Sequence, residues 1–124
     1  MNVKKQFVMN GQKRMNKYHN KKCIYKNLMF DSKKERDYYV ILEMMLKNNQ
    51  ITDLKTQVKF ELQPSFKFNG KTIRSINYIA DFTYIDKKNK LHIIDVKSEA
   101  TKKDKVYRLK KKIMQYNGYD IEEI

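Results

Sequence analysis

The sequence lacks several features on which common classes of enzyme and scaffold depend. Its single cysteine, Cys23, excludes an internal disulfide framework and fits a reducing compartment. One cysteine and two well-separated histidines, His19 and His92, do not form a zinc ligand set. The chain has 3 glycines, and none belongs to a glycine-rich phosphate loop. No pattern typical of a nucleophilic triad is present. Any chemistry therefore depends on carboxylates and lysine.

Long apolar runs are also missing. No stretch approaches the length of a membrane span, and no signal-peptide pattern is found, so we expect a cytoplasmic protein without a membrane partner. The 124 residues are enough for one domain with a modest core. Richness in Lys, Asn, Ile and Tyr is typical of an AT-rich coding genome, which fits a low-GC bacterium or a phage-infected host cell.

Positive charge is abundant and unevenly distributed. Lys and Arg number 28 against 14 acidic residues, which gives a net charge of +14. The first 30 residues contain no acidic residue and these cations: Lys4, Lys5, Lys13, Arg14, Lys17, Lys21, Lys22 and Lys26. Clustered cations displace counterions from phosphates and favour nucleic-acid binding. A solvated tail and attraction to anionic lipid are the alternatives, although the arm lacks an amphipathic period. We predict a basic arm at residues 1–27 and a folded domain at 28–124.

The hydrophobic patterning predicts an α/β (α+β-like) fold with a central mixed sheet. In chain order, the predicted elements are a helix over 32–48, a strand over 55–62 ended by Pro64, a hairpin around Asn69-Gly70, strands over 74–85 and 91–97, a helix over 101–114 and a short strand over 119–121. The strands form an antiparallel meander, and the helices flank it.

The most informative motif is Asp95-Val96-Lys97, at the end of a strand-like run. Side chains alternate between the two faces of a strand, so Asp95 and Lys97 share a face with apolar residues of that run. A fold alone gives little reason to place two charged groups at the end of a buried face. The alternative interpretation is an ion pair at the strand end.

Asp81 lies in the preceding strand, before a polar loop at residues 86–90. If Ile85 pairs with Leu91 across this loop, Asp81 lies directly across from Asp95. Two carboxylates at such positions repel each other, and a divalent cation turns this repulsion into attraction. A register slip of one residue would instead place them on opposite faces of the sheet.

Glu35 provides a third carboxylate near the start of the first predicted helix. It falls near the middle of the apolar face, whose members are Tyr38, Tyr39, Leu42, Met45 and Leu46. At this position Glu35 can reach a metal ion on the adjacent sheet. The alternative is a purely structural role, because Ser32 and Glu35 match a capping box.

A basic helix is predicted directly after the Asp95-Val96-Lys97 motif. Thr101 caps it, with Asp104 three residues further on. Its inward stripe is predicted to be Val106, Leu109, Ile113 and Tyr116. The cations that lie away from most of this stripe are Arg108, Lys111 and Lys112. They place positive charge beside the candidate metal site, although a solvated lysine face is the simpler alternative.

With these residues in view, the chain resembles the PD-(D/E)XK nuclease superfamily. It is similar to small phage-encoded endonucleases related to Holliday-junction resolvases and transposon end-cleaving nucleases. The stretches that carry the resemblance are Asn20-Lys21-Lys22, Phe30-Asp31-Ser32-Lys33-x-Glu35, Gln57-Val58-x-Phe60-x-Leu62, Tyr78-Ile79-Ala80-Asp81-Phe82 and Asp95-Val96-Lys97. They span most of residues 17–115 and imply a restriction-endonuclease-like core.

The resemblance also implies roles for individual residues. Asp81 and Asp95 bind an essential Mg²⁺, for which Mn²⁺ can substitute, and Glu35 completes or tunes the site. Lys97 orients the attacking water or stabilises charge on the phosphate. The chain departs from the superfamily pattern at Ala80, where a proline is usual, and at Asp95, where Glu is commoner. Neither departure removes a metal ligand.

The expected function is metal-dependent hydrolysis of DNA phosphodiester bonds. The residues assigned to DNA contact are Lys17, Lys21, Lys22, Gln57, Arg74, Thr101, Arg108 and Lys111. Branched DNA such as a Holliday junction is the favoured substrate, and a homodimer would place one site on each strand. Nicking or double-strand cleavage of linear DNA comes next, and an RNA-directed nuclease is not separable by sequence. The competing class is a nucleic-acid-binding protein without catalysis.

Overall fold

The computed structural model describes residues 21–124, and at its centre is a mixed sheet of four strands. The strand order is β3 (Ile51–Gln63), β6 (Ile76–Asp86), β7 (Leu91–Asp95) and β8 (Ile121–Glu123). β3, β6 and β7 form an antiparallel meander, and β8 adds parallel to β7. The predicted fold class, α/β with a central mixed sheet and flanking helices, is confirmed.

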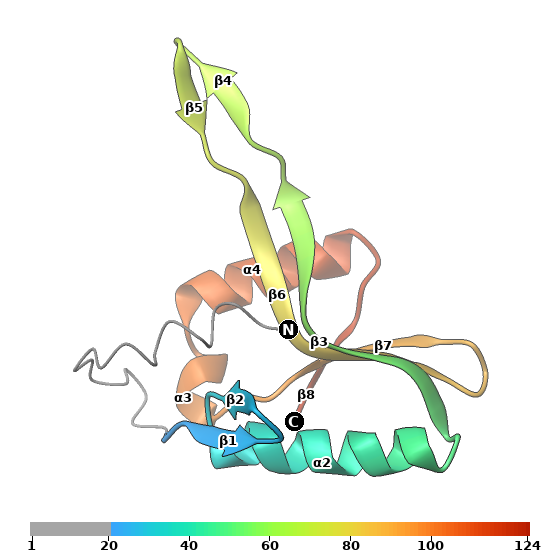
Figure 1. Ribbon diagram of the computed structural model, residues 1–124. Coiled ribbons are helices and arrows are strands. Elements are labelled where there is room, and N and C mark those ends of the chain that lie inside the picture. Colours follow the sequence, from blue (N-terminus) through green and yellow to red (C-terminus); the bar gives the residue numbers. More distant parts are fainter. Residues whose placement is uncertain (1–20) are drawn as a thin grey trace.

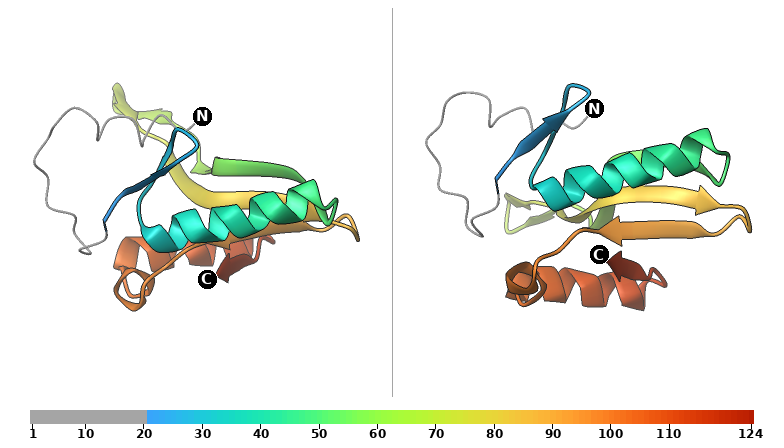
Figure 2. Two further views of the ribbon diagram at one scale, coloured as in Figure 1. Left: turned by 60° about the horizontal axis from the view of Figure 1, so that its bottom comes forward. Right: turned by 90° about the horizontal axis from the view of Figure 1, so that it is seen from below.

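Helices cover both faces of this sheet (Figures 1 and 2). Helix α2 (Lys33–Lys47) lies on one face, while α3 (Glu99–Lys102) and α4 (Lys105–Tyr116) lie on the other. Each face has its own core. The core on the α2 face contains Phe30, Leu42, Ile51, Phe82, Tyr84 and Ile94. The core on the α4 face contains Tyr78, Ala80, Ile93, Tyr107, Met114 and Ile121.

The β6–β7 hairpin has the register predicted from its loop length. Ile85 pairs with Leu91, and the pairing continues to Phe82 and Ile94. In the turn, the Asp86 carboxylate accepts backbone N–H groups from residues 88 and 90 at 2.8 and 3.0 Å, which fixes the loop length. The next position along the two strands places Asp81 beside Asp95, so the alternative register with the carboxylates on opposite faces is not adopted.

Helix α2 begins where the sequence predicted it. Ser32 is the N-cap, and its hydroxyl accepts the Glu35 N–H at 3.1 Å. Leu42 is buried and the other apolar residues of the predicted face are partly buried, except Leu46, which is exposed at the helix end. Glu35 is on the buried face, as expected, with 3% of its surface exposed.

The folded region begins before residue 28. Strands β1 (Cys23–Tyr25) and β2 (Leu28–Phe30) form a hairpin, and the Tyr25 hydroxyl donates to Glu43 of α2 at 2.9 Å. The predicted loose arm therefore extends too far at its C-terminal end. Most of its lysines, Lys17 among them, lie outside the described residues.

A second hairpin extends away from the body of the molecule (Figure 1). It consists of β4 (Phe66–Phe68) and β5 (Lys71–Ile73), and all six residues are exposed. Asn69 and Gly70 form its turn, both with positive φ (50° and 77°), as the sequence predicted.

The predicted helix over residues 101–114 is divided into two, which corrects its cap. Ser98 caps α3, and the hydroxyl of Thr101, inside that helix, accepts the Ser98 N–H. Asp104 then accepts the Tyr107 N–H at 3.0 Å and starts α4. Thr101 is therefore not the cap of the basic helix. Ser98 begins α3, and Asp104 begins α4.

The predicted inward stripe of this helix is also wrong. Val106, Leu109 and Tyr116 have 59%, 58% and 90% of their surface exposed, whereas Tyr107 and Met114 are buried. The start at Asp104 turns Tyr107 toward the sheet, where its hydroxyl hydrogen-bonds Glu123 of β8. This polar partner lets an aromatic ring take the buried position that the periodicity assigned to aliphatic residues.

Smaller differences concern strand ends. β3 begins at Ile51 rather than at residue 55, and β7 ends at Asp95 rather than at Lys97. The strand ends there because the Val96 N–H donates to the Asp81 side chain instead of to a neighbouring strand. Within residues 21–124, no helix has the length and apolar character needed to cross a membrane.

Candidate active site

A row of polar residues crosses the middle of the sheet, one from each strand. Gln57 lies opposite Asp81, between the pairs Thr56–Phe82 and Val58–Ala80. Asp81 lies beside Asp95 across the β6–β7 hairpin, and Asp95 pairs with Glu123 of β8. Because paired residues on neighbouring strands point to the same side, the register brings Asp81, Asp95 and Glu123 together. Gln57 joins them through its Nε2, which lies 3.4 Å from Asp81. We refer to these four residues as the polar row.

Asp95 is the most deeply buried carboxylate of the row, with 3% of its surface exposed. The Tyr78 hydroxyl donates to its Oδ2, and the Lys97 Nζ lies 3.3 Å from its Oδ1. Burial and the Asp95 charge raise the pKa of the Tyr78 hydroxyl, so this group stays protonated and donates. The predicted contact between Asp95 and Lys97 is therefore present.

Asp81 is half-buried, and its Oδ2 accepts the Val96 N–H at 2.9 Å. Burial and, next, the negative charge of Asp95 raise the pKa of Asp81 to about 7. The Val96 N–H and Lys97 oppose this shift without cancelling it. The protein thus holds two neighbouring carboxylates that repel each other when both are ionised.

Lys97 stands between this pair and helix α4. Its backbone N–H donates to the Ile124 carbonyl at 3.1 Å, which holds the chain just past the end of β7. Its Nζ lies 4.2 Å from the centre of the Tyr107 ring, within range of a cation–π interaction. The Lys34 side chain of α2 donates to the Lys97 carbonyl at 3.0 Å. Sequence reasoning had no signal for Lys34.

Glu35 approaches the row from helix α2. Its Oε1 accepts the Asp31 N–H at 3.0 Å, so the capping interpretation is correct in kind, although the partner is Asp31 and not Ser32. Its Oε2 lies 3.4 Å from the Gln57 Nε2, and the same Nε2 lies 3.4 Å from Asp81. Gln57 therefore links Glu35 to the row, and both interpretations of Glu35 describe part of its environment.

Gln57 is one of the predicted DNA contacts, and the structure places it among the carboxylates. Its φ is +53°, a left-handed backbone conformation inside a strand, which costs about 1–3 kcal/mol for a residue other than glycine. Its Oε1 is buried and has no hydrogen-bond partner among the described residues. A strained residue with an unsatisfied buried oxygen indicates a functional position rather than one selected for stability.

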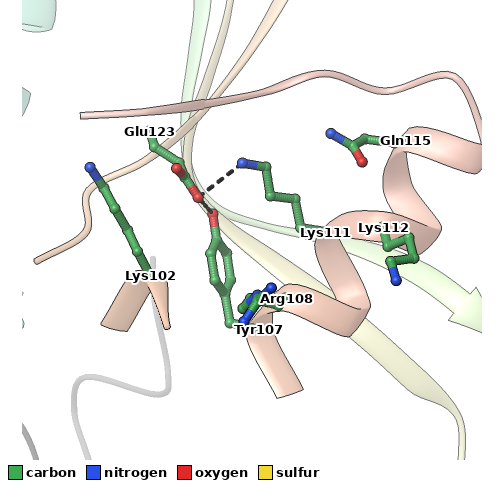
Figure 3. A pocket seen from close by; sticks show the side chains of 7 residues that line it. All are labelled: Lys102, Tyr107, Arg108, Lys111, Lys112, Gln115 and Glu123. Atoms are coloured by element: carbon green, nitrogen blue, oxygen red, sulfur yellow. Dashed lines mark hydrogen bonds and ion pairs between the residues drawn. The ribbon is translucent and has the colours of Figure 1, made fainter. Parts of the chain in front are cut away.

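Two of the predicted DNA-binding residues lie next to the row. Arg108 and Lys111 line a pocket of about 240 Å³ at helix α4 (Figure 3). Thr101 is partly buried in the α3 cap, where its hydroxyl serves the backbone. Tyr107, which forms a wall of this pocket, was not predicted from the sequence.

The other predicted DNA-binding residues are dispersed. Lys21 and Lys22 are exposed ahead of β1, and Lys22 pairs with Asp31 at 3.0 Å. Arg74 is exposed between β5 and β6, at the base of the projecting hairpin. The structure therefore does not gather the predicted DNA contacts into one cluster.

The donor set fits a hard divalent cation. Residues 21–124 contain no group of three or more His, Cys, Asp or Glu side chains placed to hold a metal ion. Mg²⁺, however, is commonly bound by one or two carboxylates together with waters and substrate phosphates. Asp81 and Asp95 offer carboxylate oxygens that repel each other, and Gln57 offers a carbonyl oxygen without a described partner. A cation bound by these oxygens would satisfy both.

Together, the fold and the polar row define an α/β protein with a concentrated acidic site on its central sheet. The chain belongs to a family of proteins of unknown function, DUF1064, whose family model matches residues 15–123. No curated protein and no solved structure matches the chain.

Proposed function

We propose that this protein is a metal-dependent DNA endonuclease that hydrolyses phosphodiester bonds. The observation that carries the proposal is the pair of mutually repelling carboxylates, Asp81 and Asp95, with Lys97 beside them. The chain around this acidic site is strongly basic, with a net charge of +14. A divalent cation would neutralise the carboxylates, and the phosphate backbone of a nucleic acid would neutralise the positive charge around them.

The resemblance to the PD-(D/E)XK superfamily supports the same proposal. A helix carrying Glu35, a central strand carrying Asp81 and a strand ending at Asp95, followed by Val96 and Lys97, come in the order expected for a restriction-endonuclease-like core. The substitution of Ala80 for the usual proline leaves a fully buried residue beside Asp81. Asp95 in place of Glu still reaches the site, because the register brings its strand next to Asp81.

The proposed cofactor is Mg²⁺, with Mn²⁺ able to substitute. Asp81 and Asp95 would hold the ion, and Gln57 is placed to offer its free carbonyl oxygen. Glu35 would tune the site through Gln57. When bound, a divalent cation polarises a phosphoryl oxygen and lowers the pKa of bound water.

The chain's own groups position and neutralise charge. Tyr78 holds one oxygen of Asp95, and the Val96 N–H holds one oxygen of Asp81, so both carboxylates are oriented before substrate arrives. Lys97 places a positive charge next to Asp95, where negative charge develops on a phosphate bound at the row. Lys34 and the Ile124 carbonyl fix the backbone of Lys97 from two sides.

Branched DNA, such as a four-way junction, is the proposed substrate, and a homodimer the proposed assembly. One small domain carries one acidic site, so two copies are the simplest way to cut two strands. The proposed setting is the cytoplasm of a bacterium or of a phage-infected host cell, in DNA recombination.

A nucleic-acid-binding protein without catalysis is the second candidate. The observation that favours it is that the described residues include no group of three metal-ligating side chains. It predicts binding that is independent of metal, and no cleavage under any condition.

The test is a cleavage assay on a labelled four-way junction and on a linear duplex of matching sequence, each with EDTA, Mg²⁺ or Mn²⁺. The proteins are wild type, Asp95→Asn, Lys97→Ala and the control Asp120→Asn, which changes an exposed aspartate outside the row. We expect metal-dependent cutting by wild type and the control, and binding without cutting by the other two. Binding without cutting by wild type in every lane would favour the second candidate.

A further inference from the structure

The pocket at helix α4 has the character of an anion site. Seven residues line its volume of about 240 Å³: Lys102, Tyr107, Arg108, Lys111, Lys112, Gln115 and Glu123. Four of them are cations and one is a carboxylate, so the lining carries a formal charge of +3. Figure 3 shows Lys102 on one side of the Tyr107 ring and Lys111 on the other.

The positive charge of this pocket is only partly matched by protein groups. Lys111 pairs with Glu123 at 3.1 Å, which uses the single carboxylate of the lining. Lys102 pairs with Glu99, whose side chain is 85% exposed. The side chains of Arg108 and Lys112 make no hydrogen bond or ion pair with any described residue. Two cations therefore remain available to an anion from solution.

Tyr107 connects the pocket to the polar row. Its ring lies under the Lys97 Nζ at 4.2 Å, and its hydroxyl donates to Glu123, the row member that pairs with Asp95. The pocket and the carboxylates are thus separated by one aromatic ring. A nucleic-acid strand with one phosphate at Asp81 and Asp95 would bring a neighbouring phosphate toward Arg108 and Lys112.

We propose that this pocket binds a second phosphate group of the nucleic-acid strand whose scissile phosphate lies at the polar row. The inference rests on the proposed function, because it assumes that a strand is bound at Asp81 and Asp95. The ligand is a phosphate oxyanion held by Arg108 and Lys112. Its source is either an internal diester of the strand or a terminal phosphate monoester.

The test is the affinity for DNA in EDTA, measured by fluorescence anisotropy over a series of salt concentrations. Two duplexes that differ only in a 5′-phosphate or a 5′-hydroxyl serve as probes. The variant Arg108→Gln/Lys112→Gln is compared with Lys87→Gln/Lys88→Gln, which removes the same charge from the exposed β6–β7 turn. For the pocket variant we expect affinity to fall about tenfold and the slope of log K against log salt to shrink by about 1, as for one lost phosphate contact. The control should keep the wild-type slope.

The two probes locate the phosphate. Equal losses on both duplexes support an internal diester, and a loss confined to the 5′-phosphorylated duplex supports a terminal phosphate. Equal affinity and slope for the pocket variant and its control would overturn the inference. Cleavage in Mg²⁺ separates this result from a failure of the proposed function. If wild type cuts DNA and the pocket variant keeps the affinity and salt slope of its control, only the pocket assignment is rejected. If the pocket variant binds more weakly but wild type does not cut, only the nuclease assignment is rejected.

Discussion

The sheet contains two groups of acidic side chains that face each other across neighbouring strands, and the two are built differently. One lies near the β6–β7 turn, where His92 stands between Asp86 and Glu122. The other is the pair Asp81 and Asp95 in the polar row. In the first group the His92 imidazole stands between the carboxylates, and in the second the carboxylates are neighbours.

In the group around His92, one imidazole ring contacts both carboxylates. Its Nε2 lies 2.7 Å from Asp86, its Nδ1 lies 2.5 Å from Glu122, and its ring stacks on Tyr84 with centroids 4.7 Å apart. Partial burial lowers the pKa of His92, but hydrogen bonds to Asp86 and Glu122 outweigh this effect and raise it. In turn, His92 lowers the pKa of Asp86. His92 and Asp86 thus each favour the charged form of the other, as expected for a structural ion pair.

In the polar row, Asp81 shows the opposite sign. Its pKa is shifted upward, which means that the fold disfavours the ionised form of this carboxylate. The β6–β7 hairpin contributes to both groups, and β8 supplies Glu122 to the first. In the polar row, Lys97 pairs with Asp95 but does not cancel the upward pKa shift of Asp81. In the proposed nuclease, a bound divalent cation would offset this repulsion.

Asp81→Asn should have the largest effect. We expect cleavage to fall about a thousandfold or more, equivalent to about 4 kcal/mol of transition-state stabilisation, because the variant loses an anionic metal ligand. In EDTA at pH 8 the same variant should be more stable than wild type by about 1–3 kcal/mol, because a repelling charge is gone. Cleavage assays and urea unfolding measure the two effects. Full activity of clean Asp81→Asn protein would refute the assignment.

His92→Leu should have the opposite pattern. The free energy of unfolding at pH 6 should fall by about 2 kcal/mol, because two hydrogen bonds and the stacking with Tyr84 are weakened. Cleavage by the folded fraction should stay within about twofold of wild type, since His92 is outside the row. Urea unfolding and cleavage at matched folded concentrations provide the test. A large loss of cleavage in fully folded protein would make the His92 group part of the site.

The pH dependence of stability without metal should separate the two groups further. The pKa of Asp81 rises from its ordinary 3.8 to about 7 in the fold, so the native state binds the extra proton and stability falls as pH rises between these values. The advantage of Asp81→Asn over wild type should therefore grow between about pH 4 and pH 7 and then level off. His92 also has a raised pKa, and its contribution is present below about pH 6.5 and is lost at higher pH. Unfolding of the three proteins across this range tests both trends, and parallel curves would contradict them.

The comparison also explains how much of the site could be predicted from the sequence. Strand alternation and loop length determine the β6–β7 register, and this register brings Asp81 to Asp95. The capping signal at Ser32 places Glu35 on the buried face of α2. These predictions succeed because each depends on local periodicity and turn geometry alone.

The parts that failed depend on tertiary contacts. Nothing local marks Gln57 for a left-handed conformation inside a strand, so its place among the carboxylates could not be predicted. Ser98, Thr101 and Asp104 are all good caps, and only the packing of Tyr107 against Glu123 decides where α4 begins. This choice also determines which face of α4 is buried and hence which cations line the pocket.

Direct binding of Mn²⁺, followed by electron paramagnetic resonance without DNA at pH 7.5, tests the central claim most directly. Wild type, Asp95→Asn and the control Asp86→Asn are titrated side by side. We expect wild type and Asp86→Asn to bind the ion and Asp95→Asn not to bind it, because Asp95 is a proposed metal ligand and Asp86 is not. Equal Mn²⁺ binding by wild type and Asp95→Asn, or loss of binding only in Asp86→Asn, would contradict the assignment of the polar row as a metal site.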